Sequence, residues 1–264
     1  MTAWPRTIGV IGCGAMGSAL AAGLVRAEPA RAASLLLADA VPETAERAAR
    51  ETGGRAVPAA EAGSADLVVL AVKPKDVEAA LAVVRPVLPH GAVLLSVVAG
   101  WTLERLAAHA GGVALARTMP NLAVRHGAGL VVLATRGIPA EVEAQLEELL
   151  RGLGAVVALP ETHFAAATGL AGCGPGFLAL VAEGLEDGGV AAGLARADAR
   201  EIVQAVLAGT AALLADGGDP AGLRQQVSSP GGATIEGIGV LERGAVRAHL
   251  ADAVRAAARR AAEL

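Results

Sequence analysis

The sequence predicts an α/β fold in which an N-terminal, Rossmann-like doubly wound sheet precedes an all-α C-terminal dimerisation domain. Short runs of Val, Leu and Ile alternate with helix-length amphipathic stretches through the first half of the chain. A glycine-rich motif directly follows the first of these runs, and the strand pattern stops after Pro160. Continuous apolar strands separated by helices are typical of a parallel sheet that is covered on both faces.

The composition narrows the class of protein further. The 264 residues carry 22 Lys and Arg against 26 Asp and Glu, which gives a net charge of −4, and 54% of them are hydrophobic. This hydrophobic content excludes a disordered chain. Because no concentrated basic face is evident, neither nucleic acid nor a membrane is an expected partner. Cys13 and Cys173 are too few and too far apart in the chain to predict a disulfide framework or a metal site.

The first domain is expected to span residues 1–160. Strands are predicted at 7–11, 34–38, 66–72, 92–98 and 113–117, and helices between them at 15–27, 42–52, 75–84 and 102–109. A strand at 129–134, a helix at 139–150 and a strand at 156–159 extend this sheet.

The second domain, residues 161–264, contains only helix patterns and glycine-rich turns. Helices are predicted at 161–170, 175–185, 198–216, 221–227, 235–243 and 246–262. Gly and Pro interrupt the uncharged stretches 87–103 and 162–182, so we expect buried segments of a soluble protein rather than membrane spans. No secretory signal is evident before the first strand, which predicts a cytoplasmic protein. The helices carry more apolar surface than a domain of this size buries alone, which predicts a homodimer or a multiple of dimers.

The turn after the first strand is predicted to bind a dinucleotide. Gly12, Gly14 and Gly17 have the GxGxxG spacing between a strand and a helix, and Ala15 and Met16 open that helix. In this context the first glycine permits a tight turn, the second lets a pyrophosphate approach the backbone, and the third allows close helix packing. The free N–H groups at the start of the helix would face the anion.

Asp39 ends the second strand, where an acidic side chain commonly binds the ribose hydroxyls of adenosine. Its carboxylate would repel the 2′-phosphate of NADPH, although Arg47 could offset this repulsion. Asp39 could almost equally cap the helix that starts at Pro42. The choice between NADH and NADPH therefore stays open, with NADH slightly favoured by this residue.

Further candidates lie at the ends of the later strands. Ligands of open α/β sheets lie beyond the carboxyl ends of the strands, which places Val72-Lys73-Pro74 beside the cofactor. The small residues Ala99-Gly100 would leave room for a nicotinamide, and Pro120 would fix the turn that aims Asn121. The alternatives are that Lys73 is a solvated surface lysine and that Asn121 only forms a turn.

The helical half contains two glycine-rich elements, at 168–176 and at Ser228-Ser229-Pro230-Gly231-Gly232-Ala233-Thr234. The second precedes the helix predicted at Ile235, so it combines free N–H groups with a helix N-terminus, an arrangement that suits a carboxylate. A helix cap with a Pro-Gly turn is the alternative interpretation.

Together these segments resemble the pyrroline-5-carboxylate reductase family over nearly the whole chain. The resemblance is carried by the N-terminal glycine motif, Val72-Lys73-Pro74, Ala99-Gly100, Met119-Pro120-Asn121, Thr168-Gly169-Leu170 with Gly172 and Gly174-Pro175, Asp187-Gly188-Gly189-Val190, Gly193-Leu194 and the segment 227–234. It implies NADPH- or NADH-dependent reduction of the C=N bond of 1-pyrroline-5-carboxylate, a cyclic imino acid, to L-proline in proline biosynthesis. It also implies that Thr234 hydrogen-bonds the ring nitrogen, that the main chain of Ser229, Pro230, Gly231 and Gly232 holds the carboxylate, and that Asn121 contributes to the substrate site. Because the imine can arrive protonated, no strong general acid is required.

The sequence departs from the family pattern near the expected substrate pocket. Ala171, Cys173 and Phe177 replace two serines and a tyrosine, Gly176 replaces an alanine, and Leu122-Ala123 replaces Thr-Pro. One alternative function is another imine or β-hydroxyacid reductase with the same two-domain plan. The β-hydroxyacid enzymes rely on a lysine in the first helix after the sheet domain, and residues 161–194 contain no lysine. A second alternative is a regulatory protein that binds NAD(P) without catalysis.

Overall fold

The computed structural model describes residues 4–263, which fall into two compact units. The first, here called the sheet unit, runs to Gly172 and also includes the C-terminal residues from Ala257. The second, the helical unit, is Cys173–Ala256. The predicted fold class is confirmed, because a doubly wound sheet is followed by helices only.

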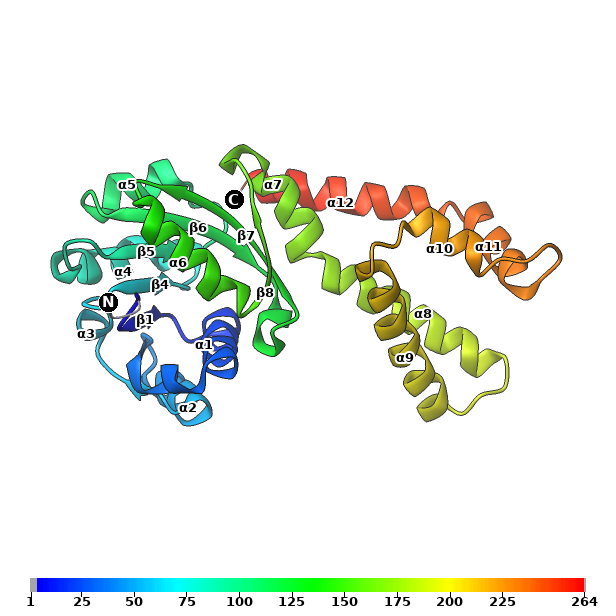
Figure 1. The fold of residues 1–264 in the computed structure, drawn as a ribbon, viewed down its shortest axis with the longest axis horizontal. Coiled ribbons are helices and arrows are strands. Elements are labelled where there is room, and N and C mark those ends of the chain that lie inside the picture. The colour runs from blue at the N-terminus through cyan, green and yellow to red at the C-terminus, as the bar shows by residue number, and fades with distance from the viewer. Residues whose placement is uncertain (1–3, 264) are drawn as a thin grey trace. The chain divides into compact units, whose positions relative to one another are not determined.

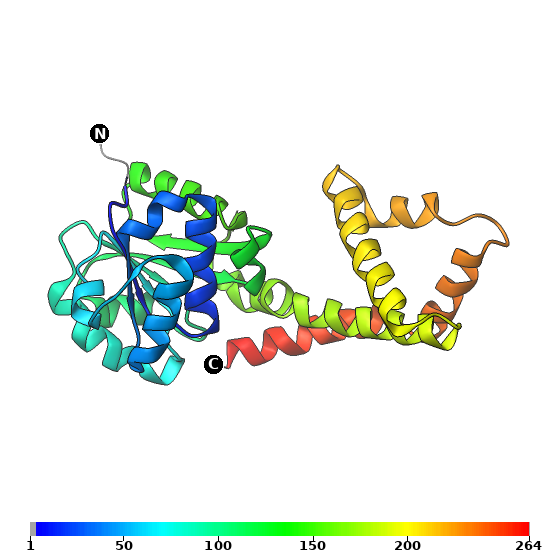
Figure 2. The same cartoon turned by 90° about the horizontal axis from the view of Figure 1, so that it is seen from below.

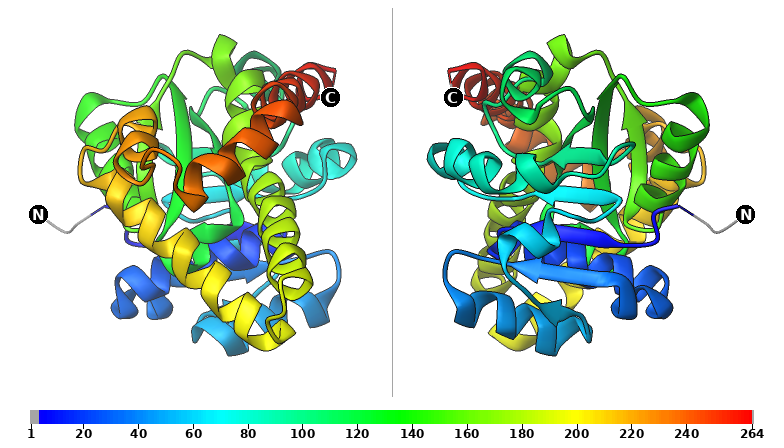
Figure 3. Two further views of the ribbon diagram at one scale, coloured as in Figure 1. Left: turned by 90° about the vertical axis from the view of Figure 1, so that its right-hand side faces the viewer. Right: turned by 90° about the vertical axis from the view of Figure 1, so that its left-hand side faces the viewer.

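One eight-stranded sheet forms the centre of the sheet unit, in the order β3-β2-β1-β4-β5-β6-β7-β8 (Figure 1). Its strands are β1 (Ile8–Ile11), β2 (Leu35–Ala38), β3 (Arg55–Ala56), β4 (Leu67–Leu70), β5 (Val93–Ser96), β6 (Ala114–Pro120), β7 (Gly129–Arg136) and β8 (Gly154–Ala158). Figure 3 shows the blue, cyan and green strands of this sheet side by side. Every predicted strand is present; β3, which has only two residues at the sheet edge, was too short to give a hydrophobic pattern.

Helices cover both faces of the sheet, as the continuous apolar strands predict. One core packs the sheet against α1 (Ala15–Ala27), α2 (Pro42–Thr52) and α6 (Ala140–Arg151). The other packs it against α3 (Ala59–Ala62), α4 (Val77–Val84) and α5 (Leu103–Ala110). Neighbouring residues such as Val10 and Ile11 belong to different cores, because successive side chains of a strand point to opposite faces.

The strand β7 corrects the expectation of a purely parallel extension. It pairs antiparallel with β6, with Pro120 opposite Val131, and β8 then pairs parallel with β7. The connection between β6 and β7 is a short 3-10 turn, Leu122–His126. A parallel crossover needs a dozen or more residues, so this short connection forces the chain to reverse direction.

The first helices after the sheet also differ from the prediction. The segment expected as two helices separated by a glycine-rich turn is helical almost throughout, with α7 (Phe164–Ala167), a π-helical turn (Thr168–Gly172) and then α8 (Gly174–Ala191). Pro175 is tolerated because it lies in the first turn of α8, where a backbone N–H has no intrahelical partner in any case.

The remaining helices are α9 (Arg196–Ala215), α10 (Pro220–Gln226), α11 (Ala233–Arg243) and α12 (Val246–Ala262) (Figure 2). Within the helical unit α8 packs against α9. Asp187 and Glu186 on α8 pair with Arg196 and Arg200 on α9.

The expected burial of residues 162–182 is wrong for the single chain. Leu170, Leu178 and Leu180 are exposed, the last by 69%. The helical stretch Glu161–Ala191 is long and apolar enough to cross a membrane by length and composition, and only 17% of its most apolar window is buried. Large apolar side chains are also exposed on α9 and α11, so several helices of this chain present uncovered apolar faces.

Candidate functional site

Two of the three glycines of the glycine-rich turn stand where a larger residue does not fit, Gly12 because of its φ and Gly17 because of close packing. Gly12 has a φ of +98°, and its N–H donates to the carbonyl oxygen of Ala38 over 2.8 Å. A Cβ on Gly17 would lie 1.9 Å from the carbonyl oxygen of Gly12. A Cβ on Gly14, by contrast, would meet no atom within 4 Å. Gly12 and Gly17 thus build the turn, while Gly14 leaves an open space above it.

The start of α1 faces this space with free hydrogen-bond donors. Gly14 is the N-cap residue, and no side chain caps the helix. Because the first N–H groups of a helix have no intrahelical acceptor, those of Ala15 and Met16 remain available. The first turn of α1 also holds no acidic residue, so the positive end of the helix dipole is not neutralised locally. This arrangement fits a pyrophosphate.

The Asp39 carboxylate is anchored on two backbone amides. Its Oδ2 accepts the N–H of Cys13 over 2.7 Å, and its Oδ1 accepts the N–H of Val41 over 2.9 Å. The alternative that Asp39 caps α2 is wrong, because Val41 is the N-cap residue and has no side-chain cap bond. Burial, assisted by the nearby Asp39 charge, raises the pKa of the Cys13 thiol to about 12.

A cavity of about 340 Å³ opens beside Asp39. It lies between the glycine-rich turn and α4, and small apolar side chains line most of its wall. The charged residues of this lining are Asp39 and Asp76. Among the described residues, no Lys or Arg lines this cavity. Arg47 lines a separate cavity of about 400 Å³ instead, together with Gly14 and Arg125.

The turns after β4 and β5 are tied to one another. The indole Nε1–H of Trp101, a fully buried side chain, donates to the carbonyl oxygen of Pro74 over 3.0 Å. Gly100 adopts a φ of +75°, and Ala99-Gly100 lines a cavity of about 180 Å³ with Met119. The structure thereby brings the predicted segments Val72-Lys73-Pro74 and Ala99-Gly100 together, although the Lys73 side chain itself is exposed.

Asn121 is engaged with the protein backbone through both ends of its amide. Its Oδ1 accepts the N–H groups of Ala123 and Leu130 over 3.2 and 3.4 Å, and its Nδ2–H donates to the carbonyl oxygen of Ala171 over 3.4 Å. These contacts give Asn121 the turn-forming role that the sequence left open. They also connect the end of β6 with the π-helical turn Thr168–Gly172.

The helical unit holds the second group of predicted residues. The N–H of Gly232 donates to the carbonyl oxygen of Ser229 over 3.0 Å, and Gly231 has a φ of +69°, as expected of a turn with Pro-Gly at its centre. The helix α11 begins at Ala233 with Gly232 as its N-cap residue, so Thr234 does not cap it. Thr234 is the second residue of α11 and is exposed, and no side chain caps the N–H groups around it.

Two functional candidates, Arg117 and Glu161, were missed by the sequence interpretation. Nη1 of Arg117 lies 2.7 Å from Oε1 of Glu161, and Arg117 is only 8% exposed. The signal was present, because Arg117 is a charged residue within a predicted buried strand, and a buried charge requires a partner. Its partner lies far along the chain, so the sequence did not identify it.

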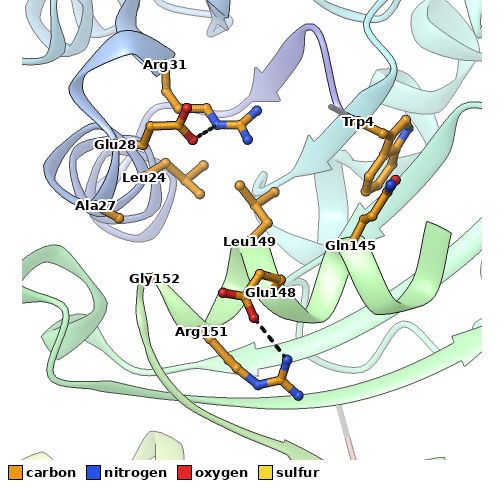
Figure 4. Close-up of a pocket in the computed structure, with 10 residues that line it drawn as sticks. All are labelled: Trp4, Leu24, Ala27, Glu28, Arg31, Gln145, Glu148, Leu149, Arg151 and Gly152. Atoms are coloured by element: carbon orange, nitrogen blue, oxygen red, sulfur yellow. Dashed lines mark hydrogen bonds and ion pairs between the residues drawn. The ribbon is translucent and has the colours of Figure 1, made fainter. Parts of the chain in front are cut away.

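Another cavity, of about 510 Å³, lies at the opposite end of α1, beside Leu24 and Trp4 (Figure 4). Its charged residues pair with one another, Glu28 with Arg31 and Glu148 with Arg151. Among residues 4–263 no group of three or more His, Cys, Asp or Glu side chains could hold a metal ion.

Comparisons with known proteins match both halves of the chain. A family model described as pyrroline-5-carboxylate reductase dimerisation matches residues 161–264, and one described as NADP oxidoreductase coenzyme F420-dependent matches residues 7–100. The curated pyrroline-5-carboxylate reductase of Pisum sativum is 35% identical over 263 residues, which cover 98% of this chain and 96% of the relative. The Thermus thermophilus reductase is 36% identical over 257 residues, which cover 96% and 97%.

Solved structures agree with these sequence matches. The 1-pyrroline-5-carboxylate reductase from Streptococcus pyogenes is 30% identical, with a TM-score of 0.85 and 98% of each chain covered. The Plasmodium falciparum pyrroline carboxylate reductase with NADP bound is 25% identical, with a TM-score of 0.88 and coverage of 98% of this chain and 97% of that one.

Proposed function

This chain belongs to the pyrroline-5-carboxylate reductase family, and from that membership we infer that it reduces 1-pyrroline-5-carboxylate to L-proline with NADPH or NADH, the last step of proline biosynthesis. Similarity to these reductases along nearly the entire chain is the observation that carries the inference. The glycine-rich turn supports it, because its second glycine leaves the space that a pyrophosphate needs. The lack of lysine in residues 161–194 disfavours a β-hydroxyacid dehydrogenase.

We propose that the sheet unit holds the cofactor. Gly12, Gly14, Ala15, Met16 and Gly17 would bind the pyrophosphate through backbone N–H groups. The turns Val72-Lys73-Pro74 and Ala99-Gly100 would border the nicotinamide, which supplies the hydride. The small side chains of Ala99-Gly100 are what close approach of a planar ring requires.

The lining beside Asp39 supports the finer proposal that NADH is used at least as well as NADPH. The Asp39 carboxylate is held in place by the amides of Cys13 and Val41, so it cannot easily turn away from a ribose in this cavity. A 2′-phosphate there would lie near two carboxylates, Asp39 and Asp76, with Arg47 in a separate cavity.

For the substrate we propose that the Thr234 hydroxyl hydrogen-bonds the ring nitrogen. The uncapped N–H groups at the start of α11, with the turn of Ser229, Pro230, Gly231 and Gly232 before them, would hold the carboxylate. A bound iminium is already electrophilic, so this chain needs only to orient the ring and exclude water from it. Asn121 stays a proposed substrate-binding residue, and its bond to the carbonyl oxygen of Ala171 would hold its side chain in place.

We also propose that residues 161–264 form the dimerisation and substrate domain of a homodimer or a multiple of dimers. The family model for this segment is a dimerisation model, and the exposed leucines of α8 and α9 offer apolar surface for such an interface. We further propose that the enzyme acts in the cytoplasm and has neither nucleic acid nor a membrane as a partner.

The test is an assay of 1-pyrroline-5-carboxylate reduction with NADH and NADPH in parallel, followed by the loss of absorbance of the reduced nucleotide. Formation of proline with either nucleotide is the expected result. Nucleotide binding without turnover of this imine or of other cyclic imines would favour the non-catalytic alternative. Turnover of another imine in preference would reassign the substrate.

A further inference from the structure

One carboxylate oxygen of Glu161, a residue that follows β8, binds both the start of α5 and the strand β6. Its Oε1 accepts Nη1–H of Arg117 over 2.7 Å and the backbone N–H of Leu103 over 2.7 Å. Leu103 is the first residue of α5 and lies three residues after Gly100. Arg117 lies in β6, two residues before Met119. We call Glu161, Arg117 and the N–H of Leu103 the clasp.

Among residues 4–263, Glu161 of the clasp is the one charged partner of Arg117. Its guanidinium is almost completely buried, lies 4.8 Å from the ring centroid of Phe164, and has no hydrogen-bond partner at Nε within the described chain. Arginine does not lose its proton in a protein, so the charge persists at every working pH. Removal of Glu161 would leave this buried charge uncompensated, and the neighbouring backbone would have to rearrange.

The clasp borders the segments that the proposed cofactor site uses. Ala99, Gly100, Met119, Arg117 and Glu161 line the same cavity of about 180 Å³. The clasp thus connects the turn after β5 to the end of β6 at the place proposed for the nicotinamide. A shift of the Leu103 N–H would move the Ala99-Gly100 turn, because only Trp101 and Thr102 separate them.

We propose that Glu161 is a positioning residue, which holds the Ala99-Gly100 turn in the shape that accepts the nicotinamide ring. This proposal rests on the proposed function for the identity of the ring, but it makes no contact between Glu161 and substrate or cofactor. Its consequence is selective: Glu161 should affect binding of the nicotinamide half and leave the adenosine half unaffected.

The test compares the affinities of purified full-length variants for NADH and for ADP-ribose, which lacks the nicotinamide, by titration calorimetry. Glu161→Ala is expected to weaken the affinity for NADH by about tenfold, which corresponds to a turn that keeps its binding shape about a tenth of the time, while the affinity for ADP-ribose changes by less than about twofold. Glu161→Gln keeps an acceptor for the Leu103 N–H and should give a smaller loss. Glu61→Gln, which breaks the exposed pair with Arg55, is the matched control and should change neither affinity.

Equal losses for NADH and ADP-ribose would show a general effect on the fold and overturn the proposal, as would unchanged affinity for both. If Glu161→Ala does not fold, the affinities of Glu161→Gln for NADH and ADP-ribose are compared instead. These binding measurements do not involve the imine, so failure of the proposed reaction in the wild type would leave them valid. Where the wild type is active, the rate constant kcat should fall with the NADH affinity.

Discussion

Replacement of Gly14 by valine is expected to weaken cofactor binding while the protein still folds. The backbone of Gly14 is extended, with a φ of −67°, so valine can adopt it, and its Cβ would meet no protein atom within 4 Å. Glycine is a better N-cap residue than valine, which predicts a destabilisation of only about 1 kcal/mol. Gly14→Val should therefore fold with a melting temperature close to that of the wild type.

The same substitution fills the space where a pyrophosphate would meet the start of α1. Loss of two charge-assisted hydrogen bonds, at about 1.5–3 kcal/mol each, predicts a loss of about 3–6 kcal/mol in binding. This corresponds to a Kd for NADH that is higher by about 10²- to 10⁴-fold. Titration calorimetry measures the Kd, and circular dichroism measures the melting temperature.

Gly17→Ala is the matched comparison, because its added Cβ would lie 1.9 Å from the carbonyl oxygen of Gly12. Such overpacking against backbone costs about 1–3 kcal/mol or more, so this variant should lose stability. A folded Gly14→Val that binds NADH as the wild type does would refute the placement of the pyrophosphate. A Gly17→Ala as stable as the wild type would refute the packing argument.

Four further outcomes are expected. Thr234→Ala should lower kcat/KM by about tenfold to a hundredfold with little change in nucleotide Kd, since the proposed hydrogen bond to the substrate, of about 1–3 kcal/mol, is lost. Thr234→Ser should retain most of the efficiency, and steady-state kinetics that find Ala equal to the wild type would remove Thr234 from the site. Asp39→Ser should increase the use of NADPH relative to NADH, and a strong NADPH preference that this change leaves untouched would show that Asp39 does not face the ribose. With a pKa raised to about 12, Cys13 is almost wholly protonated at pH 8, so iodoacetamide should modify it only after unfolding, as mass spectrometry of its peptide can show; rapid labelling in the native protein would contradict the buried environment. Light scattering should find a dimer or larger assembly at low micromolar concentration, and a stable monomer would contradict the role given to the exposed helices.

The sequence alone predicted the features that depend on local spacing. The apolar runs of β1, β4 and β5, the helix lengths between them and the change to helices after Pro160 are periodic patterns, and each is present in the structure. The backbone demands at Gly12 and Gly17 were also predictable, because a strand, a tight turn and a helix within a few residues leave few conformations open. The fold class followed from these patterns, and the family was suggested by the resemblance of the sequence motifs.

Tertiary structure decided the contacts between residues that are distant in the chain. The reversal of β7 depends on the path of the β6–β7 connection, whereas an apolar strand has the same pattern in either direction. The bond from the Cys13 amide to Asp39 joins residues 26 positions apart, and the clasp joins Arg117 to Glu161 across 44 positions. Hydrophobic periodicity specifies which face of an element is buried, but it does not specify which polar groups will pair with one another. That choice is made only when the elements pack, because a buried charge or amide must then find its partner among whatever groups the packing brings within about 3 Å.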